Sequence, residues 1–419
     1  MIVYGKKLSL FAGILLLSAC ASRTDVPLST QSLSASTIEP SQTTSPTDSN
    51  TLPHPDLAIE FELILGAAQR DRGIDVIQTR DEGYAILGYT SSSGAGGEDL
   101  YLVRLSAEGQ ELWSQTYGGE AQDNGWSIHE IEGGDFMLFG FTHSSGAGGL
   151  DFYLIRTDPD GQVLWEATYG GEDDEYGWAL SPTDDGGFVL AGQTESYGSG
   201  DIDGYLIKVD DSGELQWSQT YGGPDEDRLF SIDLCDDGGF ILTGTSGQSS
   251  TSRDVYLVRT DAQGELLWES RIGADADDVG HDVRQLVDGT FAVAGYTMNY
   301  GAERYDAMLL RVDENGEFVW RQLYGGYLED RTISLDLTLD GGFLLGGYSQ
   351  SYGNGNWDIY FVHADTDGNM LWFGVYGDLG NETGYTFVQA QDSGVVLTGE
   401  TYSSNLGEGD LIILKIGMP

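Results

Sequence analysis

The chain has 419 residues, including 61 glycines, 9 prolines and 2 cysteines, and it carries 68 acidic side chains against 19 Lys and Arg, for a formal charge of -49. A single hydrophobic core stops growing at roughly 250–300 residues, so this length predicts several domains or a repeat array. The charge argues against a nucleic-acid partner, because no basic surface is available to displace phosphate counterions, and is compatible with a solvated acidic coat, cation binding or a basic partner.

The N-terminus has the pattern of an export signal. Lys6 and Lys7 precede an apolar run over residues 8–19, which is too short to span a bilayer. The run ends in Leu17-Ser18-Ala19-Cys20, which resembles the bacterial lipoprotein lipobox, where the cysteine is diacylated and becomes the new N-terminus. We therefore predict a signal peptide over residues 1–19 and lipidation of Cys20, with an ordinary secretory signal as the alternative. The resemblance implies an extracytoplasmic protein, lipid-anchored to the outer membrane or cell surface.

Residues 21–56 are dominated by Ser, Thr and Pro and contain few large apolar residues. Such a segment cannot bury enough surface to offset its ordering entropy, so residues 20–57 are expected to form a lipidated, flexible tether. No later run is long enough for a transmembrane helix. The other cysteine, Cys235, lies in a strand-like run and is expected to be a buried apolar residue rather than a reactive thiol.

Seven repeats follow from residue 58 onward. They are marked by a tryptophan series (Trp113, Trp165, Trp217, Trp268, Trp320, Trp372) and an aspartate series (Asp99, Asp151, Asp203, Asp254, Asp306, Asp358, Asp410). The period is 52 residues, with one step of 51 between Gly244 and Asp254. A period of this size indicates a propeller or a solenoid.

Each repeat contains four strand-sized segments, which in the second repeat cover residues 126–131, 136–142, 151–157 and 162–169. Turn sequences separate them, such as Asp185-Gly186-Gly187-Phe188, which is typical of a tight hairpin turn. Four strands repeated seven times predict an all-β, seven-bladed propeller over residues 58–419.

The two ends of the repeat array complement each other. Residues 59–66 match the tryptophan strand, and residues 410–416 match the strand that precedes it. We therefore predict that the N-terminal strand completes the last blade and removes a free sheet edge. The tryptophan strand is then outermost, and the strand after Tyr-Gly-Gly is innermost and lines the axis.

The segment Arg-Thr-Asp-x-x-Gly-x-x-Leu-Trp, present at residues 156–165 and 259–268, resembles the tryptophan-docking motif of PQQ-type propellers, with a turn one residue shorter. The whole of 58–419 also resembles uncharacterised bacterial and archaeal surface lipoproteins with Asp-Gly-Gly-Phe-x-Leu-x-Gly-x-Thr repeats. The resemblance implies the fold and tryptophans packed between blades. It does not imply a quinoprotein dehydrogenase, because the chain has no adjacent cysteine pair.

One acidic residue precedes every innermost strand: Asp71, Asp123, Glu175, Asp227, Asp278, Asp330 and Glu382. Up-and-down topology places this ring on the same face as the Asp99-to-Asp410 series, near the mouth of the channel. One interpretation is a ring that binds a cation, for which Ca2+ is a candidate, or a basic ligand. The alternative is structural, in which each carboxylate accepts N–H bonds in its own turn and locks neighbouring blades.

Gly- and Ser-rich loops lie on the same face and differ in sequence between repeats. They carry candidate ligand-binding residues: Tyr197, Arg253, Tyr300, Arg304, Tyr352 and Trp357. Variable loops on a rigid scaffold are where recognition is usually built, and aromatics there could stack on sugars or grip peptides. The alternative is solvated linkers with incidental tyrosines.

The sequence offers no catalytic motif. The five histidines lack metal-ligand spacing, and there is no nucleophile elbow or P-loop. We expect no catalytic residues and no cofactor, and a monomeric binding or scaffold protein with a protein or polysaccharide partner. The alternatives are a glucanase-like carbohydrate-active hydrolase or lyase, and an outer-membrane assembly lipoprotein resembling the PQQ-type propeller of the β-barrel assembly machine, which has eight blades.

Overall fold

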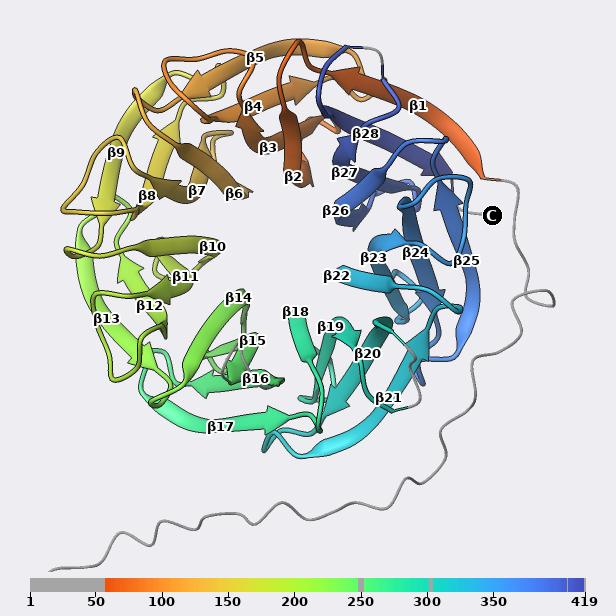
Figure 1. Ribbon diagram of the computed structural model, residues 1–419. Coiled ribbons are helices and arrows are strands. Elements are labelled where there is room, and N and C mark those ends of the chain that lie inside the picture. Colours follow the sequence, from red (N-terminus) through yellow and green to blue (C-terminus); the bar gives the residue numbers. More distant parts are fainter. Residues whose placement is uncertain (1–56, 248–251, 301–303, 405, 418–419) are drawn as a thin grey trace, which may run out of the picture. The chain divides into compact units, whose positions relative to one another are not determined.

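The computed structural model describes residues 57–247, 252–300, 304–404 and 406–417, and these residues form strands, turns and loops. They build a ring of seven sheets around a central axis (Figure 1). Within these residues, no helix is long and apolar enough to cross a membrane. The predictions for residues 1–56, which include the signal peptide, Cys20 and nearly all of the tether, lie outside the described residues.

Every blade is a sheet of four antiparallel strands. The first three blades are β2 (Asp71–Gln78), β3 (Tyr84–Thr90), β4 (Asp99–Leu105) and β5 (Glu111–Tyr117); β6 (Asp123–Glu130), β7 (Phe136–Thr142), β8 (Asp151–Thr157) and β9 (Val163–Tyr169); and β10 (Glu175–Pro182), β11 (Phe188–Thr194), β12 (Asp203–Val209) and β13 (Leu215–Tyr221). The fourth and fifth are β14 (Glu226–Leu234), β15 (Phe240–Gly247), β16 (Arg253–Thr260) and β17 (Leu266–Ile272); and β18 (Asp278–Gln285), β19 (Phe291–Thr297), β20 (Asp306–Val312) and β21 (Phe318–Tyr324).

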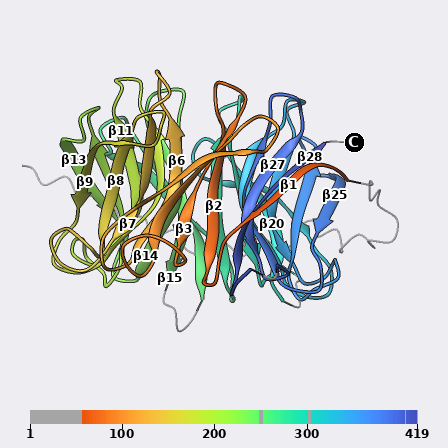
Figure 2. The same cartoon turned by 90° about the horizontal axis from the view of Figure 1, so that it is seen from above.

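The sixth blade is β22 (Asp330–Leu337), β23 (Phe343–Ser349), β24 (Asp358–Ala364) and β25 (Met370–Tyr376). The seventh is β26 (Glu382–Gln389), β27 (Val395–Thr401), β28 (Asp410–Gly417) and the N-terminal strand β1 (Ala58–Leu65). β1 pairs antiparallel with β28 from Leu65–Leu411 to Ala58–Gly417, so the orange β1 lies beside the dark blue β28 in Figures 1 and 2. The predicted seven-bladed fold and its closure by the N-terminal strand are confirmed.

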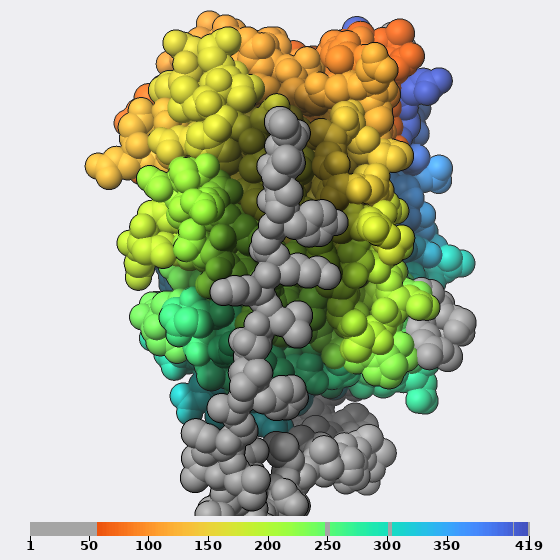
Figure 3. Space-filling model, turned by 90° about the vertical axis from the view of Figure 1, so that its left-hand side faces the viewer, coloured from red at the N-terminus to blue at the C-terminus, as the bar shows by residue number. Residues whose placement is uncertain are grey.

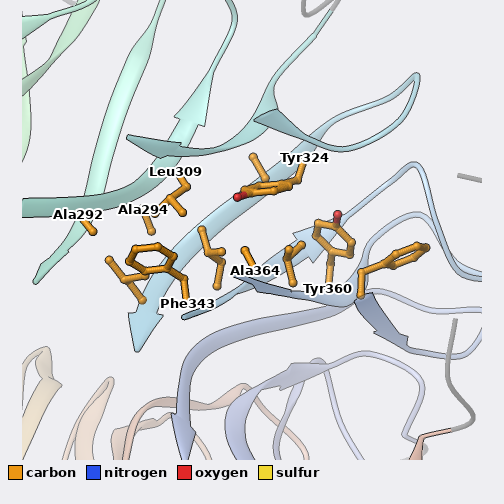
Figure 4. Close-up of a cluster of buried hydrophobic side chains, with 12 residues drawn as sticks. Ala292, Ala294, Leu309, Tyr324, Phe343, Tyr360 and Ala364 are labelled. Carbon is orange, nitrogen blue, oxygen red and sulfur yellow. The ribbon is translucent and has the colours of Figure 1, made fainter. Parts of the chain in front are cut away.

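The hydrophobic core is divided among the junctions between neighbouring blades. Every residue of β3, β7 and β11 is buried, because these second strands pack against neighbouring blades on both faces. One junction cluster joins Leu309 and Tyr324 of the fifth blade to Phe343 and Tyr360 of the sixth (Figure 4). By contrast, Leu164 of the outermost strand β9 is about half exposed. Figure 3 shows the outer side of the ring, with the second and third blades in yellow and green.

The outermost strands are anchored to the next blade along the chain. The ring of Trp113 packs against Gly161, where an added Cβ would lie 2.8 Å from the indole, and the hydroxyl of Tyr117 donates to the carbonyl of Gly161 at 2.7 Å. Phe61 of β1 occupies the equivalent place against Gly109. The positive φ of Gly161, 77°, is a second reason for glycine at this turn.

The connections between strands lie at the two faces of the ring, which Figure 2 shows from the side. We call the face with residues 91–98, 143–150 and their counterparts the loop face. The innermost strands begin at this face, and hairpin turns such as residues 79–83 lie at the opposite one, the turn face.

Candidate functional site: the loop face and the central channel

The predicted acidic ring lies where the innermost strands begin, and its side chains are buried in the blades. Asp123 illustrates the contacts. One carboxylate oxygen accepts a hydrogen bond from the hydroxyl of Thr142, and the other accepts bonds from the Gly119 N–H and the Ser144 hydroxyl, both at 2.7 Å. Asp71 accepts the equivalent three bonds. These contacts tie the innermost strand to the second strand of its own blade and to the preceding connection. A cation at this ring stays a prediction, and no group of three or more acidic, His or Cys side chains suited to a metal ion occurs in the described part of the chain.

The Asp99-to-Asp410 series faces the acidic ring across the blade junctions. At the closing junction, oxygens of Asp410 and Asp71 converge on the place that a Cβ of Gly66 would fill. The pKa of Asp306 is raised to about 7 by burial and by the facing carboxylate of Asp330. Pairs of acidic groups are therefore held inside the blade junctions, out of the bulk solvent.

Four of the six predicted loop residues make local contacts, either within their own blade or with a connection between neighbouring blades. The hydroxyls of Tyr197 and Tyr352 donate to the carbonyls of Gly170 and Gly325, at 3.0 and 2.6 Å. The guanidinium of Arg321 lies 3.3 Å from the ring centroid of Tyr300. Arg304, which is more than half exposed, approaches Glu329 at 3.7 Å. These side chains do not converge on one site.

The other two loop residues belong to one cluster at the loop face, on the fourth to sixth blades. Arg253 donates to Asp277 at 2.7 Å, and Tyr305 donates to the same carboxylate at 3.0 Å. Burial acts to raise the pKa of Asp277, but the bonds from Arg253 and Tyr305 outweigh it and hold this pKa below its usual value. The guanidinium of Arg331 lies over the rings of Tyr305 and Trp357, at 4.5 and 5.8 Å from their centroids. The structure thus brings Arg253 and Trp357 into one polar and aromatic surface.

A cavity of about 550 Å³ runs along the axis between the innermost strands, and its lining residues are not among the predicted site residues. In every innermost strand the pairing register shifts three residues after the acid of the ring, as at Trp126 between Gly125 and Ser127. A bulge of this kind re-aims a side chain. The bulged residues of all seven blades line the channel: Ile74, Trp126, Trp178, Phe230, His281, Ile333 and Tyr385.

Four of these bulged residues form an aromatic wall on the second to fifth blades. The rings of Trp126 and Trp178 meet edge to face at 4.4 Å, Phe230 lies 6.2 Å from Trp178, and His281 stacks on Phe230 at 5.2 Å. The buried indole N–H groups of both tryptophans have no hydrogen-bond acceptor among the described residues. Burial, with the nearby Arg331 and Arg253, lowers the pKa of His281 to about 4, so this imidazole is neutral near pH 7.

Acidic residues occupy the channel lining below the aromatic wall. Asp75, Asp282 and Asp336 each accept a backbone N–H bond from the innermost strand of the next blade, at 2.8–2.9 Å. Arg284 pairs with Asp282 at 2.6 Å. Burial is the largest cause that raises the pKa of Asp75, to about 6. These carboxylates join the blades and also give the channel its charge.

The repeat itself carried a signal for the channel. The residue three positions after each acid of the ring is Ile, Trp, Trp, Phe, His, Ile and Tyr in turn, while its neighbours repeat more closely. A position that varies in type inside a regular repeat marks where the sevenfold symmetry of the scaffold is broken.

Comparisons with known proteins agree with the fold. No protein-family model matches the chain. The regulatory protein FlaEY of Caulobacter vibrioides is 24% identical over 328 residues, which cover 67% of this chain and 32% of that protein. The chain therefore spans about a third of that curated relative.

Several solved propellers resemble the structure. The WD40 domain of Doa1 is 13% identical, with a TM-score of 0.54, and the match covers 87% of this chain and 98% of that one. The WD40 domain of Neurospora crassa Pan2 is 10% identical, with a TM-score of 0.55, and the match covers 86% of this chain and 97% of that one. A protein of unknown function from Dyadobacter fermentans DSM 18053 is 12% identical, with a TM-score of 0.51, and the match covers 87% of this chain and 100% of that one. At these identities the likeness shows the β-propeller fold alone.

Proposed function

We propose that this chain is a lipid-anchored binding protein of the cell envelope, whose protein partner docks on the loop face over the central channel. In this proposal residues 1–19 direct export, Cys20 carries the lipid, residues 20–57 form the tether and residues 58–419 present the binding surface. The lipobox-like residues 17–20 support the anchor. The docking of Trp113 and its counterparts on the next blade supports a grouping with PQQ-like propeller lipoproteins.

The observation that carries the proposal is where the sevenfold regularity fails. Hairpins, acidic pairs and tryptophan contacts repeat around the ring, but the channel lining and the Arg253–Trp357 cluster do not. Recognition on a rigid scaffold is built from such variable positions, and ligand cavities are commonly apolar with a few polar groups.

The contacts of the channel acids favour binding over hydrolysis. A glycosidase needs two carboxyl groups free to reach the scissile bond, one as acid and one as base or nucleophile. Both carboxylate oxygens of Asp282 already accept hydrogen bonds. Oδ1 accepts them from Ser231, Val283 and Arg284, and Oδ2 accepts one from Leu335. FlaEY is described as a regulatory protein, which supports a protein rather than a polysaccharide as the partner.

Photo-crosslinking in living cells tests this proposal. A photoreactive amino acid replaces Tyr352 or Ser404 at the loop face, and in matched strains Glu132 or Asp184 at the turn face. We expect one distinct protein adduct from the loop-face positions, reduced when Arg253→Ala and Trp357→Ala are added. An adduct from the turn face alone, or binding to a glycan array without a protein adduct, would overturn the docking face or the class of partner. Loss of fatty-acid labelling in Cys20→Ala tests the anchor separately.

A further inference from the structure

The channel contains more negative than positive charge. Its lining includes the carboxyl groups of Asp75, Asp282 and Asp336 against one guanidinium, that of Arg284, and His281 is neutral near pH 7. The side chains of Asp75 and Asp336 lie in surroundings that penalise their charged forms. A cation that enters the channel would relieve this penalty, because an opposite charge favours the ionised carboxylate.

The aromatic residues around the axis already bind cations from this chain. At the loop-face mouth, the guanidinium of Arg72 lies 5.1 Å from the ring centroid of Tyr385, and that of Arg331 lies 4.9 Å from the centroid of Tyr296. Among the described residues, no Lys or Arg lies over Trp126 or Trp178. Tryptophan is the aromatic side chain that attracts cations most strongly, so the part of the wall best suited to a cation is left open.

The unpaired indole N–H groups add a second requirement for a ligand of the channel, which is a hydrogen-bond acceptor. Trp126 and Trp178 each present a buried donor without an acceptor, and a buried donor left unpaired costs free energy. A bare metal ion offers no acceptor. A basic side chain on a peptide offers both parts, because its carbonyl groups accept hydrogen bonds while its charged end reaches the carboxylates.

From this geometry we propose that the channel receives a basic side chain, Arg or Lys, from the docked partner. Its aliphatic stem packs along the Trp126–Trp178–Phe230 wall, and its charged end lies between the tryptophan rings and the carboxylates of Asp75 and Asp336. This rests on the proposed function for the partner being a protein. The cavity of about 550 Å³ is within the range of ligand sites, and the net charge of -49 attracts a basic segment at longer range.

Peptide titration tests the inference. The probes are two nine-residue peptides of Gly and Ser, acetylated and amidated, with a central Arg or its neutral isostere citrulline. They are titrated calorimetrically into the lipid-free protein (residues 21–419) at 0.15 M ionic strength, where the Debye length is about 8 Å, so that diffuse attraction to the acidic surface is reduced. We expect one site per chain, with the Arg peptide bound at least about tenfold more tightly.

Two pairs of variants locate that site. Asp336→Asn and Trp178→Phe are expected to weaken binding of the Arg peptide severalfold, whereas the matched Asp313→Asn and Trp165→Phe, outside the channel, leave it unchanged. Asparagine keeps an oxygen that accepts the Gln389 N–H, so the blade junction is preserved, and an unchanged urea midpoint of each variant verifies its fold.

Equal affinity for the Arg and citrulline peptides, no binding of either, or equal losses in channel and control variants would each overturn the inference. Loop-face crosslinking that persists in Asp336→Asn and Trp178→Phe separates this failure from a failure of the proposed function. In that case the partner docks without inserting a basic side chain.

Discussion

Replacing Asp306 by Asn is predicted to remove part of the pH dependence of stability. Asp306 is 6% exposed, and oxygens of Asp306 and Asp330 converge above Gly325. Its pKa rises from 3.8 to about 7 on folding, so between these values the folded state binds more protons than the unfolded state. The free energy of unfolding therefore falls as the pH rises through this window. A shift of about three pKa units corresponds to about 4 kcal/mol.

Asparagine has the shape of the protonated side chain and cannot ionise. We expect Asp306→Asn to be more stable than the wild type by up to about 4 kcal/mol at pH 8 and by about 1 kcal/mol at pH 4.5. Urea unfolding at both pH values, with a constant m-value, measures the difference. The control is Asp313→Asn, in an exposed hairpin turn where backbone N–H bonds from Glu317 and Asn315 lower the pKa of the carboxyl group. A pH slope that is the same in wild type and Asp306→Asn would refute the reasoning.

Three further outcomes follow from the packing. Gly213→Ala should lower the free energy of unfolding by about 2 kcal/mol more than Gly186→Ala does. Both glycines have a positive φ, but only at Gly213 would the new Cβ lie 2.8 Å from the ring of Trp165. Equal urea midpoints of the two variants would contradict this. Phe61→Ala should lower the free energy of unfolding by about 2–3 kcal/mol, because Phe61 docks the closing strand beside Tyr84, with the two ring centroids 5.7 Å apart. The control is Ile59→Ala, because Ile59 is about half exposed. A loss of stability no larger than that of the control would contradict the role of this contact. The thiol of Cys235 is buried, and burial raises its pKa to about 12. A thiol-reactive aromatic disulfide at pH 8 should therefore modify Cys235 only after unfolding. Rapid modification of the folded protein would argue against this burial.

The sequence alone determined the number of blades, the order of their strands and the closure of the ring. It could do so because strand alternation and turn chemistry are local, and because the Trp113 series repeats them at a fixed period. The match of residues 59–66 to the tryptophan strand predicted the pairing of β1 with β28.

The tertiary structure decided which side chains face the axis. A shift of one residue reverses the direction of every side chain in a strand, and a bulge makes that shift inside each innermost strand. Asp123 is accordingly buried within its blade, whereas Trp126, which lies at the bulge, lines the channel. The presence of Arg253 and Trp357 in one cluster likewise depends on contacts across three consecutive blades, through Asp277, Tyr305 and Arg331, which no local pattern encodes.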